Sequence, residues 1–242
     1  MAAKMGAYVN SHSPGGKKCK QICQVLFWLF CFQLVPCVYP QEKTTIVLPP
    51  PRLDSNFSLE KSLFERRTKR DYLNKPISLK QLSQLLWAAQ GITSPRGFRT
   101  APSAGALYPL ELYIVVGNVS GLTTGVYHYL PHGNRLEKIM SGDKRLILSE
   151  AALYQPQVAK AAVNIVITAI FDRTTNKYGK RGTRYVYIEV GHVGQNICLQ
   201  ATALNLGVCP IGAFEDSKVS SVLKLSSDTV PVYILSVGRC QK

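Results

Sequence analysis

The main hydrophobic pattern of helical spacing in the chain lies between Arg181 and Phe214. Apolar or small side chains recur there every three or four residues, which predicts a helix that ends at Gly207. Further apolar residues lie on its other faces, so we expect a central helix that is buried on most sides. The stripe consists of Tyr185, Val186, Ile188, Val190, Val193, Ile197, Ala201 and Leu204, and the additional apolar positions are Tyr187, Cys198, Leu199 and Ala203.

The segment after this helix combines a short apolar run, Val208–Ile211, with the small residues Gly212 and Ala213. A glycine-containing turn lets the backbone approach a flat ligand closely. An ordinary core helix followed by a terminating glycine fits the same residues. Both interpretations stay open from this stretch alone.

The rest of the chain alternates irregularly between helical and strand patterns. Ser58 and Ser78 are expected to cap two helices, the second of which ends at Gly91. The turn residues 131–134 separate two segments that predict a hairpin. Together the patterns predict an α+β fold, with a mixed central sheet flanked by helices around the long central helix. Strands are expected at Leu110–Val116, Val126–Leu130, Arg135–Met140, Val163–Phe171 and Val230–Val237, and further helices at Lys144–Ala152, Gln157–Ala161 and Asp216–Leu223.

The N-terminal region differs in composition from the remainder. Lys17, Lys18 and Lys20 precede the uncharged residues 21–41, which predicts a signal peptide or membrane anchor at residues 1–43. Residues 44–57 are rich in proline and are expected to form a stiff linker, followed by one globular domain at residues 58–242. The expected location is therefore exported or membrane-anchored if the first segment acts in this way, and cytoplasmic otherwise.

The chain is strongly basic, with 29 Lys and Arg against 14 Asp and Glu and a net charge of +15. From Ser58 onward 23 basic residues accompany 12 acidic ones, so the expected domain retains a charge of +11 (23 minus 12). This balance favours anionic ligands or surfaces. No basic run is interleaved with aromatic residues as a nucleic-acid platform requires, so no nucleic-acid partner is predicted. The basic clusters at residues 66–70 and 177–184 fit either local phosphate binding or a solvated basic face.

Several common site motifs are missing from the sequence. It contains no G-x-G-x-x-G after a strand, no P-loop and no G-x-S-x-G, which argues against a Rossmann dinucleotide site, a nucleotide phosphate loop and a nucleophile elbow. The seven cysteines include no C-x-x-C pair and the four histidines are scattered. Neither a metal site nor a disulfide framework is predicted.

Three other segments are candidates for binding. Residues 66–70 offer three guanidinium groups and one hydroxyl, which are the donors that a phosphate dianion prefers. Residues 101–109 and 210–214 each form a turn of small residues beside a strand pattern.

Taken in order, these motifs resemble the FMN-dependent nitroreductase superfamily and, within it, the SagB/ThcOx-type branch of azoline oxidases. The resemblance covers about residues 59–239. It implies a homodimer with FMN at the subunit interface, and a dehydrogenase that transfers hydride equivalents through flavin N5 by a ping-pong mechanism. The series is RRTKR at 66–70, LLWAAQGI at 85–92, RTAPSAGALYPLELYIV at 99–115, KYGKRGTRYVYIEVGHVGQNICLQA at 177–201, PIGAF at 210–214 and VGR at 237–239.

The resemblance also assigns roles to individual residues. It implies a clamp for the FMN phosphate, a loop that touches the isoalloxazine ring, and a backbone segment that faces flavin N5 and O4. The clamp is Arg66, Thr68, Arg70 and Arg239 with Arg67 as a further member, the loop is Pro102, Ser103 and Gly105, and the backbone segment is Ile211, Gly212 and Ala213.

A Lys-Tyr pair upstream of the central helix is implicated in proton removal in the azoline-oxidase branch, and it matches Lys177 and Tyr178. A lysine serves as a base only if its pKa is lowered, and burial beside Arg181 and Arg184 would lower it. An exposed basic loop is the alternative interpretation of this pair.

The expected substrate is a small molecule or a peptide. Azoline oxidases act inside the cell, so the expected export segment departs from that branch and puts the peptide substrate in question. Two other functions stay open. One is a generic NAD(P)H-dependent reductase of nitro compounds or quinones, and the other is a flavin-binding or flavin-degenerate partner that scaffolds a complex without turnover.

Overall fold

The structure is a computed structural model that describes residues 44–241. Its centre is a seven-stranded sheet in the order β1-β6-β5-β3-β7-β9-β8, in which neighbouring strands pair antiparallel. Parallel pairing occurs at the Thr68–Val208 bridge on the β8 edge and in a small sheet of β2 (Ile77–Ser78) and β4 (Val119–Ser120). The seven strands are β1 (Thr45–Val47), β3 (Leu110–Val116), β5 (Gly125–Leu130), β6 (Arg135–Ser141), β7 (Val163–Ala169), β8 (Gly207–Ile211) and β9 (Val230–Gly238).

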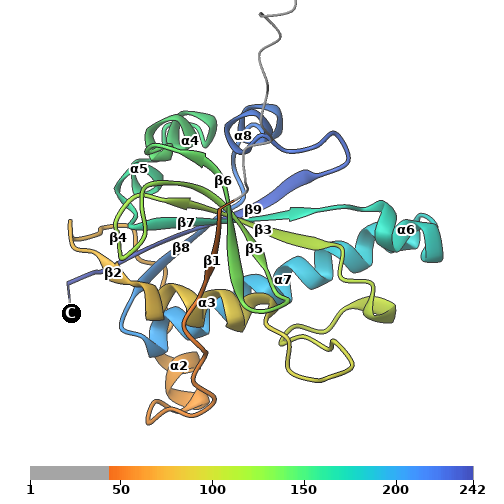
Figure 1. Ribbon diagram of the computed structural model, residues 1–242, viewed down its shortest axis with the longest axis horizontal. Helices are drawn as coiled ribbons and strands as arrows, with labels where there is room; N and C mark the ends of the chain where they lie inside the picture. The colour runs from red at the N-terminus through yellow and green to blue at the C-terminus, as the bar shows by residue number, and fades with distance from the viewer. Residues whose placement is uncertain (1–43, 242) are drawn as a thin grey trace, which may run out of the picture. The chain divides into compact units, whose positions relative to one another are not determined.

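Helices cover both faces of this sheet, as Figure 1 shows. One face carries α2 (Leu59–Glu65), α3 (Leu79–Gln90) and α7 (Arg181–Ala203). The opposite face carries α4 (Arg145–Ala151), α5 (Pro156–Lys160) and α8 (Asp216–Leu223). The short helix α6 (Asp172–Tyr178) follows the end of β7 and leads into α7. The expected α+β class is confirmed.

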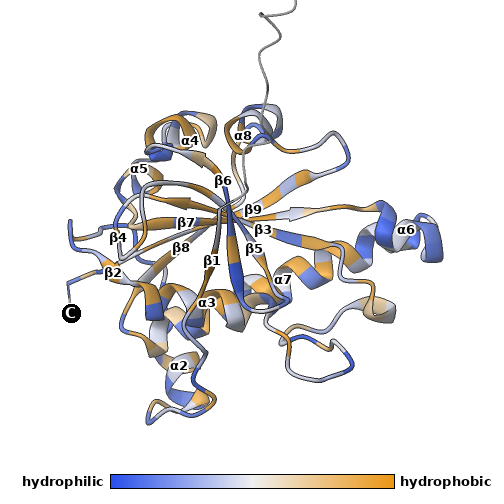
Figure 2. Ribbon diagram, viewed as in Figure 1, coloured by the Kyte–Doolittle hydropathy of each residue, from blue (hydrophilic) through white to orange (hydrophobic). Residues whose placement is uncertain are grey.

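Two hydrophobic cores fill the spaces between the sheet and its helices. Ile165 and Ile167 of β7 belong to the core beneath α3 and α7, whereas Val166 between them belongs to the core beneath α4, α5 and α8. This alternation follows from the two-residue period of a strand. A strand that is buried on both faces reads as a continuous apolar run, and the central strands are the orange segments of Figure 2.

The predicted helix starts are confirmed. The Ser58 side chain accepts a hydrogen bond from the Lys61 amide, and Ser78 forms a reciprocal capping box with Gln81. The predicted end of α7 at Gly207 is wrong. The helix stops at Ala203, and the left-handed residue after it is Asn205, with φ 53°. Asparagine tolerates this conformation, which explains why no glycine is needed there.

The expected linker is part of the folded domain. Strand β1 pairs with β6, and the side chain of Leu48 is 3% exposed in the main core. The carbonyl oxygen of Pro49 accepts hydrogen bonds from Ser83 Oγ at 2.6 Å and from Asn134 Nδ2 at 3.0 Å. The folded domain therefore includes residues 45–49 and does not start at Ser58. Prolines suit this segment because an edge strand and its extension need few amide donors.

The expected signal peptide or anchor at residues 1–43 lies outside the described residues. Among residues 44–241 the structure contains no helix with the length and apolar composition to cross a bilayer.

Helix α6 is an element that the sequence patterns do not predict. Its residues are DRTTNKY, and only Thr174 among them is buried. A seven-residue helix with one buried position has no hydrophobic period to detect. Figure 2 shows α6 as a mostly hydrophilic helix at the end of the sheet.

Candidate functional site

The structure brings the predicted flavin loop and the predicted catalytic pair together. Gly105 lies in a short 3₁₀ turn, Ala104–Ala106, with φ 63°. A Cβ atom at this position would be 2.8 Å from the Tyr178 hydroxyl oxygen and 3.0 Å from Lys177 Nζ. Ser103 Oγ accepts a hydrogen bond from the Tyr108 amide at 2.9 Å and so closes the loop behind the turn. Pro102 is exposed at the start of the loop.

Lys177 and Tyr178 form the last turn of α6. Lys177 Nζ lies 5.4 Å from the centroid of the Tyr178 ring, and that ring packs edge-on against Tyr185 with centroids 5.2 Å apart. The expected burial of Lys177 beside Arg181 and Arg184 is not found, because all three side chains are exposed in the single chain. The reason is the position of α6 at the rim of the sheet, where solvent surrounds its last turn.

A buried polar cluster lies directly behind this loop. Glu189 of α7 is 2% exposed and Gln90 of α3 is 1% exposed. Arg99 Nη1 donates a hydrogen bond to Gln90 Oε1 at 2.7 Å, and the Arg99 guanidinium stacks on the Tyr108 ring at 4.3 Å. Burial raises the pKa of Glu189, while Ser103, Gln90 and Arg99 oppose that rise.

Sequence reasoning missed this cluster, although one signal was present. Glu189 lies three residues after Val186 and four before Val193, and so it falls on the apolar stripe of the central helix. A charged residue on a buried stripe needs buried polar partners. Spacing could not indicate that Gln90 and Arg99 lie near Glu189, because they are 99 and 90 residues earlier in the chain (189 minus 90 and 189 minus 99).

A second charged group fixes α6 to the same loop. Arg173 Nη1 contacts Glu111 Oε1 at 2.6 Å and donates to the Tyr108 carbonyl oxygen at 3.1 Å. His128 Nε2 lies 2.8 Å from Glu111 Oε2. Burial alone would raise the pKa of Glu111, but the hydrogen bonds from His128 and Arg173 lower it overall.

The predicted phosphate clamp lies along the opposite end of α7, beside β8. Thr68 forms a parallel bridge with Val208, and the Lys69 amide donates to the Val208 carbonyl oxygen at 3.0 Å. Burial raises the pKa of the Cys198 thiol to about 11, and the positive charge of Arg66 opposes this. Burial also raises the pKa of the Cys209 thiol, and the positive charge of Arg70 opposes that rise. The segment that carries Arg66 and Arg70 therefore runs along β8.

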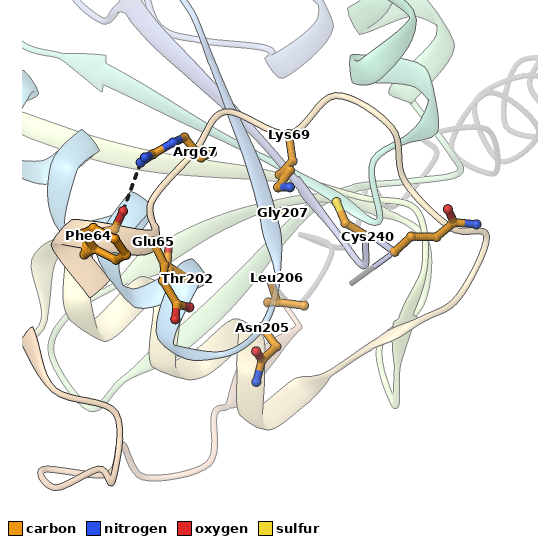
Figure 3. A pocket seen from close by; sticks show the side chains of 10 residues that line it. Phe64, Glu65, Arg67, Lys69, Thr202, Asn205, Leu206, Gly207 and Cys240 are labelled. Atoms are coloured by element: carbon orange, nitrogen blue, oxygen red, sulfur yellow. Dashed lines mark hydrogen bonds between the residues drawn. The ribbon is translucent and has the colours of Figure 1, made fainter. Parts of the chain in front are cut away.

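Arg67 faces elsewhere. Its Nη1 atom donates to the carbonyl oxygens of Phe64 at 3.0 Å and Arg66 at 2.8 Å. Together with Lys69 and Cys240 it lines a separate cavity of about 470 Å³, which Figure 3 shows. Alternate residues of an extended segment point to opposite sides, which explains how Arg67 and Lys69 separate from Arg66 and Arg70.

The remaining predicted residues lie at the two ends of β8. Gly207 pairs with Gly238 and Ile211 pairs with Ile234, so Arg239 and Gly212 are at opposite ends of the strand. Arg239 Nε donates to the Pro76 carbonyl oxygen at 2.8 Å. Ile211 is buried, whereas Gly212 and Ala213 are exposed.

The candidate residues thus form two groups within one chain. The Tyr178 ring packs on Tyr185 near the start of α7, whereas Thr68 forms a bridge with Val208 of β8, the strand that follows the end of α7. We name the group around Gly105, Lys177 and Tyr178 the loop half-site, and the group around Arg66, Thr68 and Arg70 the clamp half-site.

Comparison with known proteins relates this arrangement to one family. The model of the nitroreductase family matches residues 63–239. The protein MJ1384 of Methanocaldococcus jannaschii, which is named as a nitroreductase, is 45% identical over 181 residues, which are 75% of this chain and 90% of that protein.

Two other comparisons are informative. The microcin B17-processing protein McbC of Escherichia coli, from the branch that the sequence motifs resemble, is 30% identical over 66% of this chain and 61% of its own length. A crystal structure of a Ralstonia eutropha protein named as a nitroreductase superposes with a TM-score of 0.73 at 27% identity, over 84% of this chain and 93% of that one. This chain belongs to the nitroreductase family of oxidoreductases.

Proposed function

We propose that the protein is an FMN-dependent dehydrogenase of the SagB/ThcOx type that alternates between two substrates in a ping-pong cycle. The contact between Gly105 and the Lys177–Tyr178 pair supports this most directly. It places a titratable pair against the loop that the family resemblance assigns to the flavin ring.

The described residues fit FMN on two observations. Arg66 and Arg70 form no ion pair with a carboxylate among residues 44–241, so their charges are available to a phosphate dianion. Gly105 has no Cβ atom, and a Cβ atom there would collide with the Tyr178 hydroxyl. The backbone of the loop can therefore lie close to the last turn of α6. In this proposal Arg66, Thr68, Arg70 and Arg239 hold the phosphate, and Pro102, Ser103 and Gly105 with the backbone of residues 211–213 hold the ring. Bound FMN supplies an acceptor and donor of hydride equivalents.

The family resemblance, which implies FMN at a subunit interface, supports a homodimer. In one chain the two half-sites lie toward opposite ends of α7. Apolar side chains are available for such an interface, because Tyr187 and Ile188 of α7 are 55% and 49% exposed, and Phe64 of α2 is 79% exposed. We propose that the loop half-site of one chain completes the clamp half-site of the other.

In the proposed reaction Lys177 Nζ takes a proton from the substrate while a hydride leaves for the flavin, and the Tyr178 hydroxyl orients that amine. A second chain would bury Lys177, and burial is what disfavours the charged form of a lysine. The exposure of Lys177 in the single chain also keeps a generic NAD(P)H-dependent reductase as the second candidate. In that case the pair would bind substrate without removing a proton.

The first experiment measures the cofactor and then the electron donor. The purified protein should absorb near about 450 nm as flavoproteins do. Anaerobic mixing with a thiazoline-containing peptide should bleach that band if the protein is a dehydrogenase. Bleaching by NADH or NADPH alone would support the reductase, and a colourless protein that binds no added FMN would contradict both and favour a scaffold.

A further inference from the structure

The loop at residues 101–109 contains three residues in the left-handed backbone region. Gly105, Ala106 and Tyr108 have φ angles of 63°, 55° and 46°. This conformation suits glycine, but it strains a residue that has a Cβ atom. Such strain persists only where neighbouring groups hold the backbone in place. The contacts of Tyr108 show which groups do so.

Tyr108 is held through its ring, its hydroxyl, its amide and its carbonyl group. The Cζ atom of Arg99 lies 4.3 Å from the ring centroid, and the Arg99 amide donates to the hydroxyl oxygen at 3.2 Å. The Tyr108 amide donates to Ser103 Oγ at 2.9 Å. These contacts come from residues just before Tyr108. The fourth comes from another element, because Arg173 Nη1 of α6 donates to the Tyr108 carbonyl oxygen at 3.1 Å.

This contact continues the pairing of β3 with β7 beyond the ends of the two strands. The last paired residues are Leu110 and Ala169. Next to them, the Ile170 amide donates to the Pro109 carbonyl oxygen at 2.9 Å. The carbonyl oxygen one residue earlier accepts from the side chain of Arg173, since the chain has by then turned into α6. Arg173 therefore supplies the donor that a backbone amide would supply in a longer strand.

A carboxylate on β3 holds Arg173 in this position. The same Nη1 atom lies 2.6 Å from Glu111 Oε1. The other carboxylate oxygen of Glu111 lies 2.8 Å from His128 Nε2. The side chain of Glu111 is 19% exposed and that of Arg173 is 39% exposed. A charged contact to a mostly buried carboxylate restricts a side chain more than an ion pair in open solvent does.

The helix that carries Arg173 also carries the proposed catalytic pair. Arg173 and Lys177 are four residues apart on α6, so their side chains lie on the same face of the helix. Lys177 Nζ would be 3.0 Å from a Cβ atom on Gly105. Helix α6 therefore meets the loop at two points, at Tyr108 through Arg173 and at Gly105 through Lys177. Within α6 only Thr174 is buried, so hydrophobic burial alone holds the helix weakly.

We propose that Arg173 is a positioning residue for Lys177 and Tyr178. Its guanidinium, held by Glu111, fixes α6 against the strained backbone at Tyr108 and so sets the position of the pair beside the loop. The role of the pair in proton removal rests on the proposed function. The hold of Arg173 on α6 concerns the protein without any ligand.

The first test needs no flavin. Amide hydrogen exchange of the ligand-free full chain should be several-fold faster over residues 174–179 in Arg173→Met than in the wild type, because methionine is unbranched but donates no hydrogen bond. Exchange in β3 and β7 should stay at the wild-type rate. Arg173→Lys should restore much of the slow exchange. A single nitrogen atom of Arg173 makes both contacts, and a lysine ammonium has enough donors to replace it.

Lys180→Met is the matched control for loss of a positive charge near α6. Lys180 is exposed and lies two residues after the end of the helix. This substitution should leave exchange over residues 174–179 at the wild-type rate. Glu111→Gln removes the charge that holds Arg173 and should give a smaller change in the same residues. It serves as the second variant if Arg173→Met does not fold.

The second test measures whether Arg173 acts through Lys177. In anaerobic single-turnover reduction of the flavin by a thiazoline-containing peptide, Arg173→Met should be slower than the wild type by roughly 10–10²-fold, the scale for a misplaced reacting group. Arg173→Lys should recover much of the rate. Adding Arg173→Met to Lys177→Ala should leave the rate of Lys177→Ala unchanged, because a lysine that is absent cannot be positioned. A merely structural loss would lower that rate further.

The outcomes separate this proposal from the proposed function. Faster exchange in Arg173→Met, rescue by lysine and non-additive rates support the proposal. Wild-type exchange over residues 174–179 in both Arg173→Met and Glu111→Gln, or an equal effect in Lys180→Met, overturns it whether or not the protein binds FMN. Faster exchange with additive rate losses overturns the positioning of Lys177. A wild type that binds no FMN or oxidises no such peptide contradicts the proposed function, and the exchange test then decides whether Arg173 holds α6.

Discussion

A Cβ atom on Gly105 would stand 2.8 Å from the hydroxyl oxygen of Tyr178, closer than real Cβ contacts allow. The two residues are 73 positions apart in the sequence (178 minus 105), and they belong to a loop before β3 and to the helix after β7. Their contact follows from the pairing of β3 with β7, because Leu110 and Ala169 are partners at that end of the sheet. The pairing of β3 with β7 therefore brings the loop and α6 to the same end of the sheet.

Gly105→Ala is expected to displace Tyr178 or the loop and to weaken FMN binding. Its positive φ adds a backbone cost of about 1–2 kcal/mol for any residue with a Cβ atom. Gly97→Ala is the matched control, since Gly97 has φ 80° but nothing within 4 Å of its missing Cβ. Thermal unfolding should show a similar backbone cost for both, while titration with FMN should show a loss for Gly105→Ala alone. Equal FMN affinities in the two variants would contradict the role of this contact.

The variants Arg70→Ala and Arg67→Ala distinguish an arginine that is proposed to bind the FMN phosphate from a neighbouring arginine that is not. Removing Arg70 should weaken FMN binding by roughly 1.5–3 kcal/mol, the range for a hydrogen bond to a charged group. Removing Arg67 should have little effect, because its guanidinium lines the other cavity and contacts backbone carbonyls. Fluorescence titration with FMN and with riboflavin measures both. Equal binding of FMN and riboflavin by the wild type, or an equal loss in the two variants, would exclude this clamp.

The sequence predicts the fold well where one pattern dominates. The capping serines of α2 and α3, the hairpin of β5 and β6, and the bounds of α8 follow from local rules, because each depends on side chains within a few residues. The end of α7 and the presence of α6 do not, since an asparagine replaces the usual glycine and α6 buries a single residue. Strand β1 was missed because prolines next to it indicate a linker, whereas its partner β6 lies about ninety residues later.

The candidate site also combines features that the sequence predicts with features that only the structure shows. The order of motifs is sufficient to list the candidate residues, but not to show that Arg67 turns away from Arg66 and Arg70. The exposure of Lys177 and the burial of Glu189 both depend on how α6 and α7 meet the sheet. Tertiary packing of this kind leaves no trace in local spacing, except for the charge on the apolar stripe of α7.

Leu48→Ala should destabilise the domain, although Leu48 lies in the segment that the sequence predicts to be a linker. Its side chain is 3% exposed in the main core, and truncating a buried leucine costs about 2–5 kcal/mol. Exposed Leu53, at 83%, provides the control substitution Leu53→Ala. Deletion of residues 1–56 should likewise lower the denaturation midpoint relative to deletion of residues 1–42, since only the longer deletion removes β1 and Leu48. Chemical denaturation of the four proteins decides the matter, and identical midpoints would restore the linker interpretation.

Glu111→Gln should reduce stability in a pH-dependent way. Hydrogen bonds from His128 and Arg173 keep the pKa of Glu111 below its ordinary value in spite of burial. A lowered carboxylate pKa stabilises the folded state above the unfolded value of about 4.3, and this stabilisation is lost as the pH falls through the folded value. At pH 7 the substitution should therefore cost about 1.5–3 kcal/mol, and the difference from wild type should shrink below about pH 4.3. Urea unfolding at several pH values measures it, with Glu150→Gln as an exposed control. A difference that does not change with pH would assign the loss to packing instead.

Lys177→Ala and Tyr178→Phe test the step that separates a dehydrogenase from a reductase. If Lys177 removes the substrate proton, its loss should slow substrate oxidation by about 10²–10⁴-fold, the usual contribution of a positioned acid or base. FMN content and flavin bleaching by NADPH should stay near wild type, because neither needs that proton transfer. Tyr178→Phe keeps the ring that packs against Tyr185 and removes only the hydroxyl, so its loss should be smaller. Lys180→Ala, an exposed lysine just after α6, controls for the general charge of this surface. The measurement is anaerobic single-turnover reduction of the flavin by thiazoline-containing peptides. Equal rates in Lys177→Ala and wild type would assign the pair to the surface, and efficient bleaching by NADPH without any dehydrogenation substrate would favour the generic reductase.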